Sequence, residues 1–152
     1  MEIQATDDGD AQFLHLGRLV SRAARLYARA ADQALSPLGL RHAYIPVIAA
    51  LRGGQTMNQT ALAAEIGMEQ PSMAELLGRM QRDNLVSVSR HPSDARRRVI
   101  GLTPEAMPVL DEAHDRLIAL QRWALAGFTP QDTAALGHAL EKLTDNLDQG
   151  PR

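Results

Sequence analysis

Residues 86–103 limit the possible fold most strongly, because they have the pattern of a short β-hairpin in a chain otherwise patterned for helices. Valine and serine alternate at 86–89, residues 91–94 have the chemistry of a tight turn, and an apolar run resumes at Val99. Two antiparallel strands joined by a short loop are the simplest interpretation.

This hairpin is strongly basic, although the chain as a whole has a formal net charge of -2. Only one acidic residue, Asp94, opposes the four arginines of the segment, which are Arg90, Arg96, Arg97 and Arg98. Arginine is long, flat and permanently charged, so it suits phosphates and the negative potential of a narrow minor groove. We expect Arg96 to enter the groove and Asp94 to orient an arginine through a charge-assisted bond.

Composition indicates one domain, or a small domain with added helices, since 152 residues with 45% hydrophobic content can form a core. The absence of cysteine excludes disulfides, thiolate zinc sites and cysteine redox switches. An acidic N-terminus and the lack of an apolar run of about 20 residues predict a soluble cytoplasmic protein. No nucleophile elbow, phosphate loop or paired-carboxylate pattern occurs, so we expect neither an enzyme nor a bound cofactor.

The first part of the chain has helical periodicity. Residues 1–10 are expected to be flexible, and apolar residues at alternating steps of three and four predict a long amphipathic helix over 13–34. That helix should end near residues 36–39, which contain proline and glycine. A second helix is expected over 41–52, ending at the glycines 53–54.

Two short helices in quick succession follow. Asn58 is placed to cap a helix that Gly67 ends, and Pro71 suits the first turn of a second helix that runs to about Asp83. A helix-turn-helix places its second helix in the major groove of DNA, where Gln can pair with adenine and Glu can accept from cytosine. The candidate DNA-contacting residues of this second helix are Gln70, Ser72, Met73, Glu75, Arg79 and Arg82.

Long helices are predicted after the hairpin. Thr103 and Pro104 should open one that Pro108 bends, and Thr129, with Asp132 in the first turn, should open the last. The last helix carries an apolar stripe of Leu136, Leu140, Leu143 and Leu147. Such stripes exceed what a small domain covers, which favours a dimer, although packing of the two chain ends on each other is an alternative.

The predicted fold class is therefore mainly α with a two-stranded β wing. A winged helix-turn-helix DNA-binding lobe over 41–103 lies between dimerisation helices at 11–40 and 104–148. This arrangement resembles the MarR family of bacterial winged-helix regulators. The motifs that carry the resemblance are Leu85-Val86, Asp94-x-Arg96, Val99-x-x-Leu102-Thr103, Leu62-Ala63 with Ile66-Gly67, and Gln70-Pro71-Ser72, and the most specific is DARRRVIGLT at 94–103.

The resemblance implies a homodimer made by the first and last helices, an inverted-repeat site in double-stranded DNA, repression of nearby genes and release by a small aromatic or phenolic ligand. Asn84 stands where the family usually has glycine, and asparagine is the next best residue for a left-handed helix exit. Glu75 stands where a basic or polar residue is common, so sequence preference should differ from that of relatives.

The effector and the alternatives remain open at this point. His15, Arg18 and Tyr44 are the candidate ligand-binding residues, since they lie on elements that would border the family's pocket. A metal-responsive regulator is one alternative, because Asp111, His114 and Asp115 share one predicted helix and His138 and Glu141 another. A helical protein-interaction module without DNA binding is the other, and steep salt dependence of duplex binding would argue against it.

Overall fold

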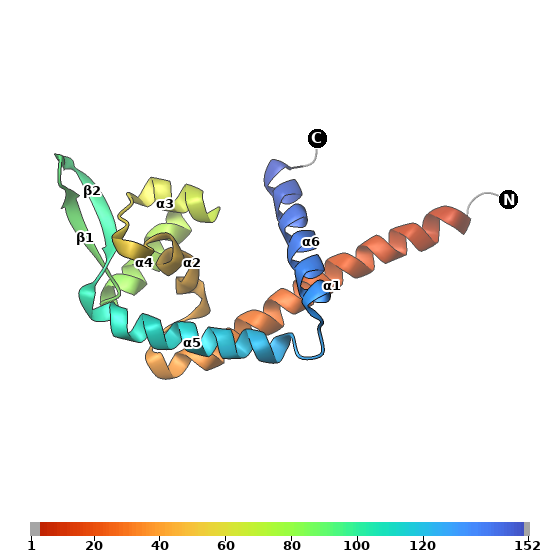
Figure 1. The fold of residues 1–152 in the computed structure, drawn as a ribbon. Helices are drawn as coiled ribbons and strands as arrows, with labels where there is room; N and C mark the ends of the chain where they lie inside the picture. Colours follow the sequence, from red (N-terminus) through yellow and green to blue (C-terminus); the bar gives the residue numbers. More distant parts are fainter. Residues whose placement is uncertain (1–3, 151–152) are drawn as a thin grey trace. The chain divides into compact units, whose positions relative to one another are not determined.

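The structure, a computed structural model, describes residues 4–150 and is mainly helical with one two-stranded antiparallel sheet (Figure 1). This confirms the predicted fold class. The chain divides into two compact units, one up to Leu117 and one from Ile118 onward. The long elements are α1 (Gln4–Leu35), α2 (Ile45–Ala50), α3 (Gln59–Ile66), α4 (Gln70–Arg82), β1 (Val86–His91), β2 (Asp94–Leu102), α5 (Met107–Ala124) and α6 (Pro130–Gln149).

Helix α1 confirms the predicted long amphipathic helix but begins earlier than expected. The segment predicted to be flexible, residues 1–10, is helical from Gln4, and residues 1–3 lie outside the described residues. No proline interrupts residues 4–35, and extending an existing helix costs far less than nucleating one. The helix ends in a short 3-10 turn, Ser36–Leu38, followed by Gly39 in the left-handed conformation (φ 70°).

The helix predicted over 41–52 is wrong as a single element. Its α-helical part, α2, has only six residues and lies between two 3-10 turns, His42–Tyr44 and Arg52–Gly54. Pro46 in the first turn of α2 fixes where the α-helix begins, since its missing N–H needs no partner there. Gly53 and Gly54 end it with positive φ angles of 70° and 79°, which an α-helix does not allow.

The helix-turn-helix is confirmed as α3 and α4. Asn58 caps α3 because its side-chain oxygen accepts from the amide of Ala61 at 2.8 Å. Gly67 ends α3 with a φ of 70°, and Pro71 lies in the first turn of α4. All three predicted signals are present, and only three residues separate the end of α3 from the start of α4.

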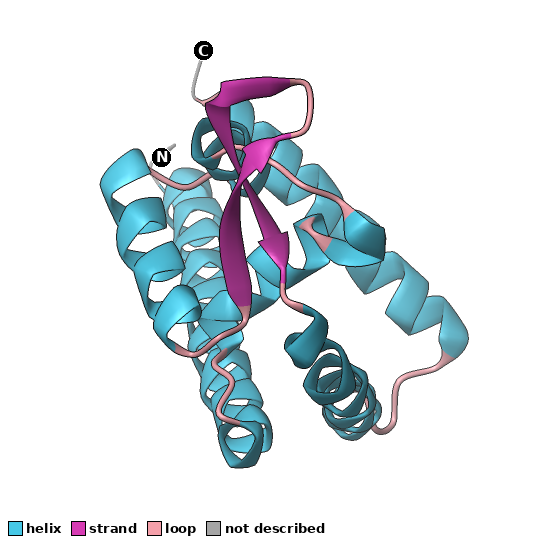
Figure 2. Cartoon of the chain, turned by 90° about the vertical axis from the view of Figure 1, so that its left-hand side faces the viewer, coloured by secondary structure: helices cyan, strands magenta, loops and turns pink. Residues whose placement is uncertain are grey.

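The hairpin is also confirmed, and it is strongly twisted (Figure 2). Its register runs from Val86 opposite Leu102 to Arg90 opposite Arg98, and a register shift follows before the tip. At the base, Met57 pairs with Ile100 through two backbone bonds of 3.1 and 2.7 Å. The wing is therefore attached directly to the residues that precede α3.

Asn84 and Thr103 close the base of the hairpin from the other side. Asn84 adopts a left-handed φ of 56°, as expected from its place after α4. Thr103 donates from Oγ1 to the carbonyl of Asn84 at 2.6 Å, and its amide donates to the carbonyl of Leu85 at 3.0 Å. The hydroxyl of Thr103 thus joins the two ends of the hairpin and does not cap a helix, contrary to the prediction.

A 3-10 turn, Pro104–Ala106, separates Thr103 from α5. Pro108 is consequently the second residue of α5 and lies in its first turn, where the N–H of a residue has no helical partner. The bend predicted at Pro108 is therefore wrong. The start of α6 is confirmed, since Thr129 and Asp132 form a reciprocal capping box with backbone bonds of 3.1 and 2.9 Å.

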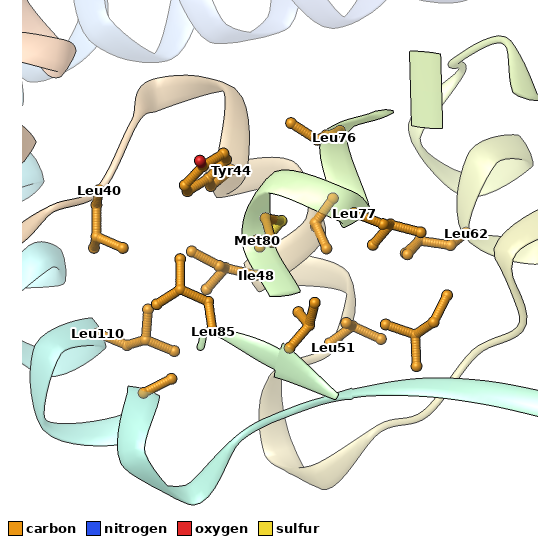
Figure 3. Packing of buried hydrophobic residues seen from close by; sticks show 14 of the residues in the cluster. Leu40, Tyr44, Ile48, Leu51, Leu62, Leu76, Leu77, Met80, Leu85 and Leu110 are labelled. Carbon is orange, nitrogen blue, oxygen red and sulfur yellow. The ribbon is translucent and has the colours of Figure 1, made fainter. Parts of the chain in front are cut away.

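The hydrophobic core joins the helix-turn-helix to the end of α1 and the first part of α5 (Figure 3). Tyr44 and Leu51 come from the segment around α2, Leu62 from α3 and Met80 from α4, and all four are almost completely buried. Leu110 of α5 closes the cluster. Burial of this kind contributes about 1.5–3 kcal/mol of stability per large apolar side chain. The core therefore fixes the position of α4 relative to the elements that pack against it.

Within residues 4–150, no single helix is long and apolar enough to cross a membrane. The bent pair 9–38 and 42–54, with an angle of 91°, meets the test of length and composition alone, which the core helices of other proteins also meet.

Candidate nucleic-acid interface

Helix α4 divides into a buried face and an exposed face. Met73, Leu76, Leu77 and Met80 pack into the core, whereas Gln70, Ser72, Glu75 and Arg82 are exposed. Met73 is 0% exposed, so its predicted contact with DNA is wrong. Its position follows the helical repeat of three and four residues that it shares with the other core residues of α4.

The first residue of α4 contacts the first residue of α3. Gln59 donates from Nε2 to Oε1 of Gln70 at 3.3 Å, across the turn of the helix-turn-helix. Sequence reasoning missed Gln59. The available signal was its spacing of 11 residues from Gln70, with each glutamine opening one of two helices joined by a tight turn.

Farther along α4, Glu75 and Arg79 form an ion pair of 2.7 Å on one helix face. Both were predicted to contact DNA separately. Arg79 satisfies the carboxylate at a helical spacing of four residues, so the negative charge of Glu75 is locally balanced. An exposed pair of this kind contributes little to stability and can open when another partner is present.

The wing presents its arginines without a neutralising carboxylate. Arg90 and Arg98 are directly opposite each other in the hairpin, and like charges in that position repel. Arg96 lies two residues before Arg98, so the alternation of a strand assigns both to one face and Arg97 to the other. None of the ion pairs formed within residues 4–150 includes these four arginines.

Asp94 holds Arg96 through its backbone. Its Oδ1 accepts from the amide of Arg96 at 3.0 Å, so the predicted charge-assisted bond is present but does not involve the guanidinium. On the other side of the tip, His91 Nδ1 accepts from the amide of Ser93 at 3.2 Å. Both bonds are local turn bonds, and they leave the charged end of Arg96 exposed.

The predicted ligand-binding residues do not come together. His15 and Arg18 are exposed on α1, whereas Tyr44 is in the core at 1% exposure. Tyr44 donates from its hydroxyl to Oδ2 of Asp83 at 2.6 Å, and burial, followed by this hydrogen bond, raises the pKa of Tyr44. Tyr44 therefore lines no open site, and its prediction as a ligand contact is wrong.

An open hollow does lie between α2 and α5 in the first unit. Its cavity volume is about 100 Å³, and Arg52 and His114 are the polar residues among its largely apolar walls. The full lining is Ile45, Ile48, Ala49, Arg52, Leu110, Ala113, His114 and Leu117. Both helices contribute residues at the spacing of one helical face, so each helix lines the hollow with one stripe of side chains.

The metal-responsive alternative finds no site in the described part of the chain. Groups of three or more His, Asp or Glu side chains that could hold a metal do not occur among residues 4–150. The residues predicted for a metal, which are Asp111, His114 and Asp115 on α5 and His138 and Glu141 on α6, therefore do not form such a group. A structural zinc centre takes four protein ligands and a catalytic one three.

Large apolar side chains are exposed on the terminal helices. Phe13 of α1 is 74% exposed and Trp123 of α5 is 73% exposed, and α6 buries none of its residues. The stripe predicted on α6 includes Leu136, Leu140 and Leu147, all exposed. Apolar surface of this extent is typical of a surface that contacts another protein.

Known proteins share this arrangement. Residues 38–97 match the model of the MarR family. The HTH-type transcriptional regulator YwoH of Bacillus subtilis (strain 168) is 27% identical over 124 residues, which cover 82% of this chain and 90% of that protein.

Solved structures agree in fold over most of the chain. A mutant of MarR from E. coli in complex with operator DNA has a TM-score of 0.78 at 21% identity, and the match covers 87% of this chain and 95% of that one. CouR from Rhodococcus jostii RHA1, bound to p-coumaroyl-CoA, has a TM-score of 0.74 at 26% identity, with 84% and 90% covered.

A helix-turn-helix followed directly by an arginine-bearing hairpin defines a winged helix-turn-helix, the class of fold seen in DNA-binding proteins. The resemblance to the MarR family that the motifs around the wing predicted is confirmed over residues 38–97, which its model matches.

Proposed function

We propose that the chain is a repressor that binds an inverted repeat in double-stranded DNA as a homodimer and is released by a small ligand. It acts as a regulator and not as an enzyme, and it works in the cytoplasm, where it meets the DNA. The observation that carries the proposal is the set of four wing arginines, exposed beside α4 and outside every ion pair formed by the described residues.

The division of labour between helix and wing follows from their chemistry. Exposed polar side chains at the start of α4, Gln70 and Ser72, suit the edges of bases in the major groove. Arg96 at the wing tip suits the adjacent minor groove, and Arg90, Arg97 and Arg98 suit phosphates. Arg79 and Arg82 extend the basic side of α4 toward the backbone of the duplex.

The terminal helices support a dimer. Segments 11–40 and 104–148 carry all of the exposed large apolar residues except Val88, whereas 41–103 carries the helix-turn-helix and the wing. A two-fold dimer would place two recognition helices about 34–36 Å apart, one turn of duplex, and so select an inverted repeat. The operator complex of the E. coli relative is consistent with this use of the fold.

The groove between α2 and α5 supports a ligand of one aromatic ring with a carboxylate. A cavity of about 150 Å³ suffices for benzene, so a groove of about 100 Å³ that is open on one side suits a single ring and little more. Arg52 supplies a fixed positive charge for a carboxylate, and His114 a second hydrogen-bonding group. These residues replace Tyr44 as the proposed contacts, while His15 and Arg18 stay predictions that no contact in the structure supports.

Selection of binding sites from a random pool of duplexes, followed by salt titration, tests the proposal. The selected sites should contain an inverted repeat, and affinity should fall steeply as salt rises, since each neutralised phosphate releases counterions. A chain that enriches no sequence and binds no duplex at low salt would contradict the proposal and support the protein-interaction alternative.

A further inference from the structure

The contact between Gln59 and Gln70 suggests a function for a residue outside the recognition helix. Gln59 lies on α3 and Gln70 on α4, and their side-chain amides meet at 3.3 Å, with Gln59 as the donor. Each residue opens its helix, so each side chain starts from the well-ordered first turn of its own helix. The contact bridges the two halves of the helix-turn-helix on its exposed side.

The two residues that precede Gln59 hold it in place. The preceding residue, Asn58, caps α3 with a 2.8 Å bond, and Met57 pairs with Ile100 of β2 through two backbone bonds. Gln59 therefore extends from a segment attached both to α3 and to the wing. A side chain with such an anchor loses less conformational entropy when it orients a neighbour than one on a free loop.

The direction of the hydrogen bond determines which way the amide of Gln70 faces. Because Gln59 donates, Oε1 of Gln70 is directed toward α3, while both hydrogens on its Nε2 remain available. A carbonyl oxygen has two lone pairs, so Oε1 of Gln70 can still accept a second hydrogen bond. Adenine requires this combination, an acceptor for its N6 amino group and a donor to its N7.

Few other side chains at the start of α4 can read a base. Pro71 has no donor, Met73 is in the core, and Glu75 is in an ion pair with Arg79. Ser72 is exposed as well, but its hydroxyl is a single atom, whereas Gln70 carries its donor and its acceptor on two atoms, as a bidentate contact with adenine requires. Its orientation matters for recognition because a reversed amide would present the donor and the acceptor in the wrong order.

We propose that Gln59 is a positioning residue that fixes the side-chain amide of Gln70 for the recognition of adenine in the major groove. The inference rests on the proposed DNA-binding function and adds a residue of α3 to the determinants of sequence preference. Gln59 does not need to touch a base, because it acts by donating a hydrogen bond to Oε1 of Gln70.

Base preference measured on full-length variants tests this inference. Sites selected with the unmodified chain identify the base pair whose preference is lost in Gln70→Met, and all four base pairs are then compared at that position. Gln59→Met keeps the length of the side chain but removes the donor. We expect adenine to be preferred by roughly tenfold in the unmodified chain and by at most about twofold in Gln59→Met, with preferences elsewhere unchanged.

Two further variants separate positioning from a structural effect. The double variant Gln59→Met with Gln70→Met should show no lower preference than Gln70→Met alone, because the two residues act through one contact. Gln59→Glu replaces the donor by an acceptor, so it should reduce the adenine preference at least as strongly as Gln59→Met. Thr60→Ala, on the next exposed residue of α3, should leave the preference unchanged, and circular dichroism melts should confirm that every variant folds.

The outcomes distinguish this inference from the proposed function. Salt-dependent, sequence-selective binding with full adenine preference in Gln59→Met would overturn the inference and leave the proposed function intact. A uniform loss of affinity for all sites in Gln59→Met would also overturn it, since it would indicate a general contact. Absence of duplex binding by the unmodified chain would overturn the proposed function itself.

Discussion

Tyr44 and Asp83 join two elements that lie 39 residues apart, through a hydrogen bond of 2.6 Å from the tyrosine hydroxyl to the carboxylate. Asp83 caps the C-terminus of α4, where the negative end of the helix dipole disfavours a carboxylate. The hydroxyl of Tyr44 compensates by donating to it from the core. The end of the recognition helix is thereby fixed to the segment that precedes α2.

Tyr44→Phe should lower the free energy of unfolding by about 1–2 kcal/mol, because the charged acceptor loses its donor while the ring stays buried. Urea denaturation monitored by circular dichroism measures the change. Asp83→Asn is the matched variant, since its amide oxygen can still accept from Tyr44, and it should cost less. Equal stability of Tyr44→Phe and the unmodified chain would show that the hydrogen bond contributes nothing net.

Alkaline pH should weaken the same contact. Burial, and then the hydrogen bond to Asp83, raise the pKa of Tyr44 above its ordinary value of 10.0. The folded state therefore binds this proton more tightly than the unfolded state, so the contribution is complete below pH 10.0 and is lost as pH rises through the folded pKa. The stability difference between the unmodified chain and Tyr44→Phe should shrink above pH 10, and a constant difference from pH 8 to pH 11 would refute this linkage.

The sequence predicted the local features of the helix-turn-helix well. Asn58, Gly67 and Pro71 each start or end a helix through residues within one helical turn in the sequence, so a short pattern is enough to predict their roles. The hairpin was predictable for the same reason, from alternation and turn residues. The capping box of Thr129 with Asp132 also depends on a spacing of only three residues.

Features that depend on distant partners were not predictable. Tyr44 was predicted to contact a ligand, but in the fold its hydroxyl is bonded to Asp83. Met73 was predicted to contact a base, but its side chain is buried in the core. The contact of Gln59 with Gln70 depends on the angle between two helices, which no short pattern specifies. Sequence alone therefore predicted the helix-turn-helix and the wing that form the candidate interface, but not which of their side chains are exposed.

The repulsion between Arg90 and Arg98 should lower the stability of the free protein, while the same two charges strengthen DNA binding. Arg98→Ala removes one of two directly opposed positive charges, so the free protein should gain up to about 1 kcal/mol in stability. The same change should weaken DNA binding and lower the salt dependence by about one released counterion. Urea denaturation and binding isotherms at several salt concentrations measure the two effects.

Arg96→Ala is the matched variant for this comparison, because Arg96 has no opposed arginine in the register. It should cost about 1–3 kcal/mol in operator binding without a gain in stability. Unchanged operator affinity of folded Arg96→Ala would remove Arg96 from minor-groove recognition.

Benzoate should bind in the groove between α2 and α5 and release the operator. The carboxylate pairs with Arg52 and the ring packs against apolar residues such as Ile48 and Leu117. Arg52→Ala should weaken benzoate binding about tenfold or more by calorimetry, since a charge-assisted hydrogen bond is lost. Benzyl alcohol lacks the carboxylate, so its binding should be the same in both proteins, and equal losses for both ligands would indicate a collapsed groove.

The apolar stripe of α6 should hold the dimer together. Leu140 is 44% exposed in the single chain, and covering it and its neighbours in a partner interface would remove that surface from water. Leu140→Ala should raise the dissociation constant of the dimer by one to two orders of magnitude, roughly 1.4–3 kcal/mol for two symmetry-related sites. Analytical ultracentrifugation over a range of concentrations measures the constant.

Asp145→Ala is the matched control, because at 3.6 residues per turn its side chain lies on the side of α6 opposite to the stripe. This variant should leave the dissociation constant unchanged. A concentration-independent monomer in the unmodified chain would instead show that the exposed leucines serve another partner, and it would leave the inverted repeat without its structural cause.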